Sequence, residues 1–154
     1  MLQANLEQKE EQMEKRMSLL RTTPTIMVVD DNYELLEELQ EMLTLGGYHV
    51  EAVHDSSAAF AQAHRIKPDV ILLDLKMSPK SGFQVADELR HSIHMKDVPI
   101  IAMTGFFTEQ EHILMMKLCG IKIFILKPFN PVNLIAKIEF ALGRRQEEYD
   151  DQTT

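Results

Sequence analysis

Five side chains with reactive or ion-binding groups follow apolar segments of the chain. They are three carboxylates, one hydroxyl and one ammonium group: Asp30, Asp31, Asp74, Thr104 and Lys127. Carboxylates held close together repel one another unless a cation neutralises them, and oxygen ligands suit a hard ion such as Mg²⁺. With the ion bound, one carboxylate can attack phosphorus while the ammonium group stabilises the phosphoryl oxygens. A fold that gathers these groups would therefore support phosphoryl transfer.

The segment before Asp74 indicates how that carboxylate is positioned. Residues 70–73 are four consecutive branched apolar residues, Val-Ile-Leu-Leu. This uniform apolar character is typical of a strand that is buried on both faces at the centre of a parallel sheet. Asp74 would then emerge at the carboxyl edge of the sheet, where open α/β folds bind their ligands. We therefore expect function to depend on Asp74.

Strand-like and helix-like segments alternate along the chain. The strands are expected at residues 25–29, 48–53, 70–74, 98–103 and 121–126. Helical periodicity follows each strand, with Ser56 and Ser57 as expected caps of the second helix and Asn130 at the start of the last. This alternation indicates right-handed βαβ units around one parallel sheet, with helices on both faces. Because parallel strands end at the same edge, the reactive side chains named above should face one crevice.

The composition bounds the number of domains. The chain has 154 residues, of which 45% are hydrophobic and 26% charged, as expected for one globular domain. Residues 1–23 form a leader rich in Glu, Gln, Lys and Met, either a weakly amphipathic helix or a solvated, partly disordered segment. The folded domain is expected at 24–143, followed by a polar tail at 144–154.

Charge and cysteine content exclude several classes of function. A formal net charge of −8 argues against direct nucleic-acid binding, which depends mostly on Lys and Arg. Cys119 is the only cysteine, so an internal disulfide and a cysteine-rich zinc site are excluded. No apolar stretch approaches the roughly 18 residues needed to span a bilayer, and the N-terminus lacks the apolar segment of a signal peptide. We therefore expect a cytoplasmic protein without a membrane partner.

Four motifs occur in a characteristic order, each at an expected strand end. They are Val28–Asn32, Leu72–Met77 with Gly82 eight residues after Asp74, Ile100–Gly105, and Phe124–Phe129. Together these motifs resemble the receiver domain of two-component response regulators, of the kind found in chemotaxis regulators, over about residues 24–143. The resemblance implies a flavodoxin-like (βα)5 fold, a doubly wound parallel sheet of five strands in the order 2-1-3-4-5. The leader adds an N-terminal helical extension.

The resemblance also implies a role for each reactive group. Asp74 would accept a phosphoryl group from a sensor histidine kinase or a phosphotransfer protein. Mg²⁺ would be bound directly by Asp31, largely through water by Asp30, and by the backbone carbonyl of Lys76. Two phosphoryl oxygens would be bound by Lys127 and by the Thr104 hydroxyl. The chain would thus be a signalling domain that assists its own phosphorylation and dephosphorylation rather than an enzyme.

A conformational output is implied as well. Phe124 occupies the family's aromatic switch position, where the ring turns inward as Thr104 moves. The Lys127–Pro128 bond would carry the family's cis peptide. A downstream effector or output domain would then detect a change in the surface formed by the family's fourth helix, fifth strand and fifth helix. This surface and the N-terminal helix are the two expected routes to a homodimer.

Some positions depart from the family pattern. Ser78 stands where family members often have proline, and the proline follows as Pro79. Lys76 and Phe106, two residues after Asp74 and Thr104, border the path of the hydrolytic water in the family. A bulky pair there predicts slow self-dephosphorylation.

Two other classes of function share parts of this pattern. The chain can be a degenerate receiver that acts as a phosphorylation-independent protein-interaction module, although retention of all five reactive side chains argues against it. A flavodoxin-like nucleotide or flavin binder would need a Gly-rich phosphate loop after the first strand, where Asp30 and Asp31 stand instead.

Overall fold

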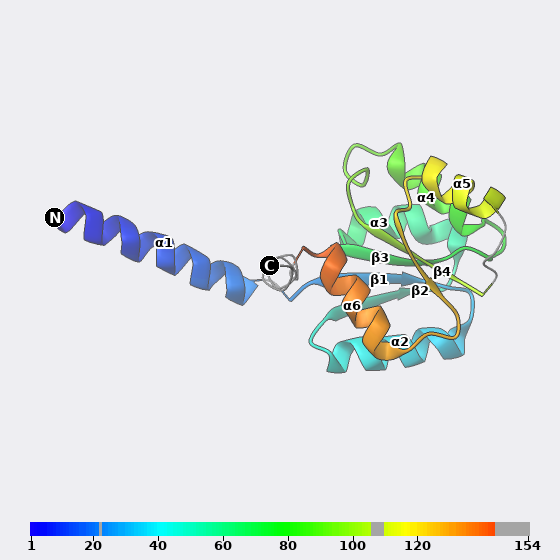
Figure 1. The fold of residues 1–154 in the computed structure, drawn as a ribbon, viewed down its shortest axis with the longest axis horizontal. Helices are drawn as coiled ribbons and strands as arrows, with labels where there is room; N and C mark the ends of the chain where they lie inside the picture. Colours follow the sequence, from blue (N-terminus) through cyan, green and yellow to red (C-terminus); the bar gives the residue numbers. More distant parts are fainter. Residues whose placement is uncertain (22, 106–109, 144–154) are drawn as a thin grey trace, which may run out of the picture.

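One parallel sheet forms the centre of the molecule (Figure 1). The computed structural model describes residues 1–21, 23–105 and 110–143. Neighbouring strands pair in the order β2-β1-β3-β4-β5, and every pair is parallel. The strands are β1 (Thr25–Val29), β2 (His49–Val53), β3 (Val70–Asp74), β4 (Ile100–Thr104) and β5 (Ile123–Leu126). The predicted flavodoxin-like fold and strand order are confirmed.

Helices cover both faces of the sheet (Figure 1). One face packs against α2 (Tyr33–Leu45) and α6 (Pro131–Ala141). The other face packs against α3 (Ala59–Ile66), α4 (Gly82–Arg90) and α5 (Gln110–Leu118). The remaining helices are α1 (Leu2–Arg21) and the short 3-10 helix η1 (Ser56–Ala58).

The central strand β3 contributes to both of the apolar clusters that these layers enclose. Ile71 and Leu73 pack on the side of α3 and α4, whereas Val70 and Leu72 pack on the side of α2 and α6. Successive strand side chains point to opposite faces, so a strand covered on both sides needs an apolar residue at every position. This requirement explains the uniform apolar run before Asp74.

Two strands begin later than predicted because the preceding helices end in Schellman motifs. Gly47 and Gly120 adopt left-handed φ angles of 92° and 71°. The N–H of the next residue, Tyr48 or Ile121, then donates to a carbonyl in the last helical turn, at 3.1 and 2.8 Å. These bonds are part of the helix terminus rather than of the sheet. The strand β4 also differs from the prediction, since it begins at Ile100 and includes Thr104 as its last residue.

The prediction that Ser56 and Ser57 cap the second helix of the domain was wrong. The N-cap residue of α3 is Ala58, which makes no side-chain cap bond. Asp55 caps η1 instead, and its Oδ1 accepts from the N–H and the hydroxyl of Ser57, at 2.9 and 2.6 Å. The buried Ser56 Oγ instead accepts from the N–H of Lys80, at 3.0 Å. Ser56 therefore connects η1 by a hydrogen bond to the loop between β3 and α4.

The start of α4 lies unusually close to the end of β3. Ser81 and Gln84 form a capping box, in which each side chain accepts from the backbone N–H of the other residue, at 3.3 and 2.9 Å. Gly82 follows the cap, and its N–H donates to the carbonyl of Leu75 at 3.0 Å. A Cβ on Gly82 would lie 2.2 Å from the carbonyl oxygen of Asp74. Only glycine allows α4 to approach β3 this closely.

Replacing Gly82 by alanine is expected to destabilise the chain by about 3 kcal/mol, because backbone atoms of β3 must move to admit the new methyl group. Urea unfolding measures the change. Gly105→Ala is the matched control, since a Cβ there meets nothing within 4 Å. Equal stabilities of the two variants would contradict the packing argument.

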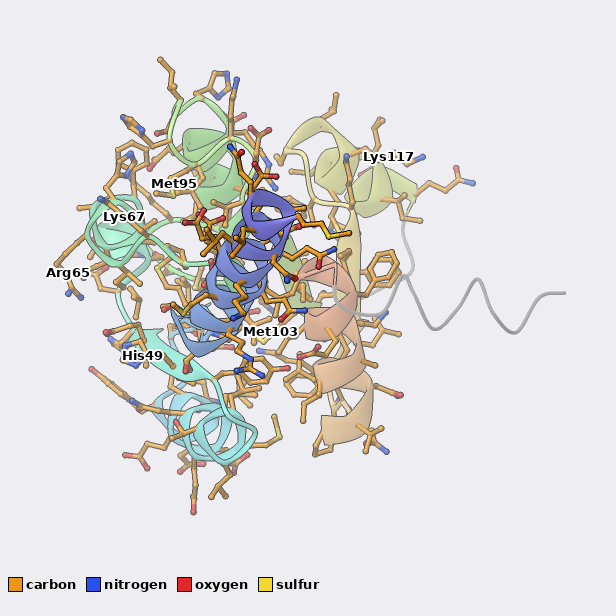
Figure 2. The ribbon with its side chains drawn as sticks, turned by 90° about the vertical axis from the view of Figure 1, so that its left-hand side faces the viewer. His49, Arg65, Lys67, Met95, Met103 and Lys117 are labelled. Carbon is orange, nitrogen blue, oxygen red and sulfur yellow. The ribbon has the colours of Figure 1, made fainter. Side chains whose placement is uncertain are left out.

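The leader forms the predicted helix, α1, which projects from the body of the domain (Figure 1). Its described side chains are all exposed, so the helix is also solvated. Figure 2 looks toward α1, with Arg65 and Lys67 on one side of the domain and Lys117 on the other. Met103 of β4 is fully buried. None of the helices in the described part of the chain is long and apolar enough to cross a membrane.

Candidate functional site

The carboxyl edge of the sheet gathers the predicted reactive side chains. Asp30 follows β1 directly, while Asp74 and Thr104 are the last residues of β3 and β4. One carboxylate oxygen from each of Asp30, Asp31 and Asp74 lies within 4.8 Å of the others. Asp30 and Asp74 are buried, and Asp31 is exposed. The three carboxylates therefore form one cluster with an opening toward solvent at Asp31.

Lys127, which follows β5, supplies a positive charge to this cluster. Its Nζ lies 2.8 Å from Oδ2 of Asp30 and 3.5 Å from Oδ1 of Asp74. The Asp30 side chain is only 1% exposed, so solvent cannot stabilise its charge. Pairing with the ammonium group offsets part of the desolvation cost of both carboxylates.

Backbone N–H groups fix the orientation of the two buried carboxylates. The N–H of Asn32 donates to Oδ1 of Asp30 at 2.9 Å, and the N–H of Lys76 donates to Oδ1 of Asp74 at 3.3 Å. Asn32 also caps α2, since its Oδ1 accepts from the N–H of Leu35. Asn32 thus combines the helix-cap function, which Asp30 and Asp31 do not perform, with support of the acidic cluster.

The environment changes the acidity of Asp74. Burial, and then the negative charge of Asp30, raise the pKa of Asp74 to about 6, while Lys127 acts in the opposite direction. The carboxyl is therefore mostly ionised at neutral pH, but ionisation is unfavourable. A cation bound beside it would relieve this cost.

The raised pKa predicts a specific pH dependence of stability. Between about pH 4 and pH 6 the native chain retains a proton on Asp74 that the unfolded chain has released. The contribution of Asp74 to the free energy of unfolding therefore falls by about 3 kcal/mol in total as the pH rises through this window. Asp74→Asn should lack this decrease. Urea unfolding of the native chain and of Asp74→Asn at about pH 4.5 and 7.5 measures the free energy of unfolding of each. If the difference between these two free energies is the same at both pH values, the prediction is contradicted.

Thr104 and Phe124, the predicted switch residues, lie on adjacent strands. Thr104 is buried, and its carbonyl accepts from the N–H of Lys127 at 2.7 Å. Phe124 is partly buried and packs against the cluster on the side of α3 and α4. Phe106 lies outside the described residues, so slow self-dephosphorylation stays a prediction. The cis peptide at Lys127–Pro128 is confirmed, and Ser78–Pro79 is also cis.

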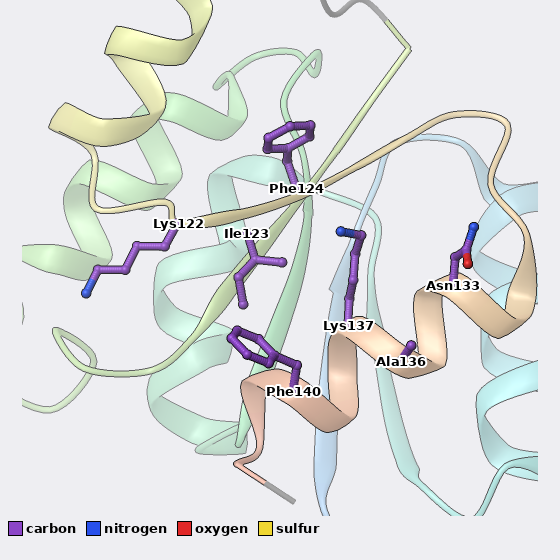
Figure 3. A pocket seen from close by; sticks show the side chains of 7 residues that line it. All are labelled: Lys122, Ile123, Phe124, Asn133, Ala136, Lys137 and Phe140. Carbon is purple, nitrogen blue, oxygen red and sulfur yellow. The ribbon is translucent and has the colours of Figure 1, made fainter. Parts of the chain in front are cut away.

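A groove of about 610 Å³ lies between β5 and α6 (Figure 3), and Asp30, Asp31 and Asp74 are not among the described residues that line it. Ile123 and Phe124 point to opposite sides of β5, with Ile123 directed toward Phe140 of α6. Lys122 and Lys137 also line this groove, and no carboxylate from the described part of the chain does. The chemistry of the acidic cluster is therefore separate from this groove.

The residues at the cluster suit Mg²⁺. Their donor atoms are all oxygens, and two of the three carboxylates are buried with a single described ammonium group beside them. Hard divalent cations prefer such ligands, and two buried carboxylates with one lysine retain an excess of negative charge. The acidic cluster therefore fits the ion that the sequence predicted.

Two structural features beside Asp74 go beyond what the sequence predicts. Gly82 is a motif position in the sequence, but its close approach to Asp74 is a contact between backbones, which leaves no signal beyond the glycine itself. The Ser81 capping box does have a sequence signature, Ser-x-x-Gln before an apolar periodic segment, which could have predicted the start of α4.

Comparison with known sequences identifies relatives over most of the chain. The response regulator receiver domain model matches residues 26–139. The transcriptional regulatory protein CpxR of Klebsiella pneumoniae is 34% identical over 129 residues, 84% of this chain and 53% of that protein. The DNA-binding response regulator MtrA of Mycolicibacterium smegmatis is 31% identical over 123 residues, 80% of this chain and 52% of that protein. The chain spans about half the length of the curated relatives it matches.

Solved structures share the fold. Chemotaxis protein CheY4 of Vibrio cholerae has a TM-score of 0.75 and 29% identity, covering 79% of this chain and 100% of that chain. The receiver domain of sensor histidine kinase PA1611 from Pseudomonas aeruginosa has a TM-score of 0.73 and 27% identity, covering 79% and 99%. That structure has a magnesium ion coordinated in its active site cleft. By sequence, strand order and the acidic cluster at the sheet edge, this chain belongs to the response regulator receiver domain family.

Proposed function

We propose that Asp74 accepts a phosphoryl group from the phosphohistidine of a sensor histidine kinase or a phosphotransfer protein. The observation that carries this proposal is the convergence of Asp74 with Asp30, Asp31 and Lys127 at one sheet edge. A carboxylate oxygen of Asp74 forms the new P–O bond while the P–N bond to the donor histidine breaks. The donor imidazole leaves as the neutral ring after it takes up a proton.

Mg²⁺ would be held by Asp31 directly, by Asp30 largely through water, and by Asp74 and the backbone carbonyl of Lys76. When bound, the ion supplies positive charge to the phosphoryl oxygens. Asp31 is exposed, which supports its direct contact with an ion that enters from solvent. Asp30 is buried, which supports its contact with the ion largely through water.

Lys127 and Thr104 complete the proposed site. The Lys127 Nζ is 3.5 Å from Asp74 Oδ1, so a small movement would let it bind an oxygen of a phosphoryl group attached there. The Thr104 hydroxyl would bind a second oxygen, and Phe124 would follow its movement. The exchange of the Lys127–Asp74 contact for a phosphoryl contact is the first step of the proposed switch.

The output surface is proposed to be the face of α5, β5 and α6, which correspond to the family's fourth helix, fifth strand and fifth helix. Large apolar side chains are exposed there: Leu114, Leu118, Leu126, Val132 and Phe140. Such a patch supports docking of a downstream effector or output domain. Self-association through this face or through α1 is part of the same proposal, as is a cytoplasmic location.

Acceptor chemistry is favoured over a phosphorylation-independent interaction module by the site itself. An interaction module that is never phosphorylated gains nothing from two buried carboxylates whose charges repel each other. The raised pKa of Asp74 reflects the free-energy cost of this repulsion and burial.

The test is phosphorylation by acetyl phosphate, a small phosphodonor. Incubation with Mg²⁺ is expected to add the mass of one phosphoryl group per chain, in a bond that is stable to mild acid and labile to base. A chelator such as EDTA should suppress the gain by at least about 100-fold, because several carboxylates then remain unneutralised. Failure of the native chain to gain mass, or equal gain in EDTA, would defeat the proposal.

A further inference from the structure

A pair of aromatic rings lies at the carboxyl edge of the sheet, beside the acidic cluster. Tyr33 is the first residue of α2, two residues after Asp31, and His54 is the first residue after β2. The ends of β1 and β2 adjoin, because the N–H of Asp30 donates to the carbonyl of Val53 at 3.2 Å. The pair therefore borders the cluster on the side of β2, opposite the strands β4 and β5.

The two rings are stacked, and one of them is open to solvent. Their centroids are 3.7 Å apart and their planes differ by 11°. Tyr33 is 64% exposed, whereas His54 is half-buried. Both backbones are fixed by neighbouring caps, since Asn32 caps α2 and Asp55 caps η1. The Tyr33 ring, supported by His54, is therefore preorganised to stack against a further planar group.

The charges around this pair indicate which planar group fits. Three exposed carboxylates accompany the rings in the chain: Asp31 and Glu34 on either side of Tyr33, and Asp55 directly after His54. They favour a positively charged ring over an anionic one, and the face of an aromatic ring attracts a cation as well. In the reaction proposed above, the ring that reaches this edge is the imidazole of the donor phosphohistidine, which takes up a proton before it leaves.

We propose that Tyr33 is a specificity-determining residue for the phosphodonor, with its ring stacked against the donor imidazole during transfer to Asp74. This inference rests on the proposed acceptor function. The P–O bond forms at a carboxylate oxygen of Asp74 as the P–N bond breaks. The imidazole keeps the electron pair of that bond and leaves as a neutral ring, because its other nitrogen carries a proton. A donor without a ring gains nothing from the stack.

The experiment compares two small donors on the full chain with Mg²⁺: phosphoimidazole, which carries the ring, and acetyl phosphate, which does not. Mass spectrometry measures the rate of phosphorylation of the native chain and of Tyr33→Leu, which keeps an apolar side chain but loses the ring. The rate with phosphoimidazole should fall about tenfold, and the rate with acetyl phosphate should stay within about twofold of the native rate.

Two further variants serve as controls. Tyr33→Phe keeps the ring and should retain the native rates with both donors. Phe60→Leu removes another exposed ring that pairs with a histidine, since the Phe60 and His64 centroids are 4.4 Å apart on α3. It should also retain both rates, because Phe60 does not belong to the stacked pair beside the acidic cluster.

An unchanged rate with phosphoimidazole in Tyr33→Leu would overturn the inference. An equal fall with both donors would overturn it too, because the effect would then not depend on the donor ring. In both cases acetyl phosphate still phosphorylates the native chain, so the acceptor function stands. If neither donor phosphorylates the native chain, the proposed function fails and this inference fails with it.

Discussion

Asp74→Asn is expected to lose phosphorylation by acetyl phosphate at least about 1000-fold, because the amide oxygen is a far weaker nucleophile than the carboxylate. At the same time the variant should be more stable than the native chain in the absence of Mg²⁺, by up to about 3 kcal/mol near pH 7.5. The gain follows from the raised pKa of Asp74, since the native chain pays for ionising a buried carboxyl beside Asp30. Mass spectrometry and urea unfolding measure the two effects.

The combination of opposite effects makes this variant informative. An inactive but stabilised protein has lost a chemical group rather than its fold. Asp97→Asn, which removes an exposed carboxylate, is the matched control. It should keep the phosphorylation and the stability of the native chain. A destabilised Asp74→Asn that still gains a phosphoryl group would refute both the acceptor assignment and the electrostatic argument.

Lys127→Met is expected to destabilise the chain by about 3 kcal/mol in the absence of Mg²⁺, because the buried charge of Asp30 loses its partner at 2.8 Å. Lys80→Met is a strict control. Lys80 pairs with Glu88 at 2.7 Å, a similar distance, but both side chains are 36% exposed. Its loss should cost no more than about 1 kcal/mol, since solvent screens an exposed pair.

A double-mutant cycle separates the pair from other effects of Lys127. Asp30→Asn removes the buried charge but keeps an oxygen that can accept from the N–H of Asn32. In this background Lys127→Met should cost much less, which gives a coupling energy of more than about 1 kcal/mol. Equal costs of Lys127→Met in the two backgrounds, or equal costs of Lys127→Met and Lys80→Met, would show that the charge on Asp30 does not need this partner.

The sheet and its reactive edge could be predicted because each depends on a rule with few exceptions. Burial on both faces requires an apolar residue at every position of β3, so Val70–Leu73 identified the central strand. Parallel strands end at one edge, so the carboxylates, Thr104 and Lys127 had to converge once the strands were known. The positions of these residues at the ends of the apolar segments can be found directly in the sequence.

Other features depend on contacts between residues far apart in sequence, which local patterns do not encode. Ser56 looked like a helix cap, but its hydroxyl accepts from the N–H of Lys80, 24 residues away. Strand boundaries near Tyr48 and Ile121 shifted because the glycines before them end helices through bonds to the last turn.

The most direct test of the central claim identifies the phosphorylated residue chemically. The chain is incubated with Mg²⁺ and acetyl phosphate and then treated with borohydride, which reduces an aspartyl phosphate to homoserine. Peptide mapping by mass spectrometry then locates the converted position. The proposed site predicts homoserine at position 74 alone and none when Mg²⁺ is removed. Conversion at Asp30 or Asp31 instead, or at no aspartate, would contradict it.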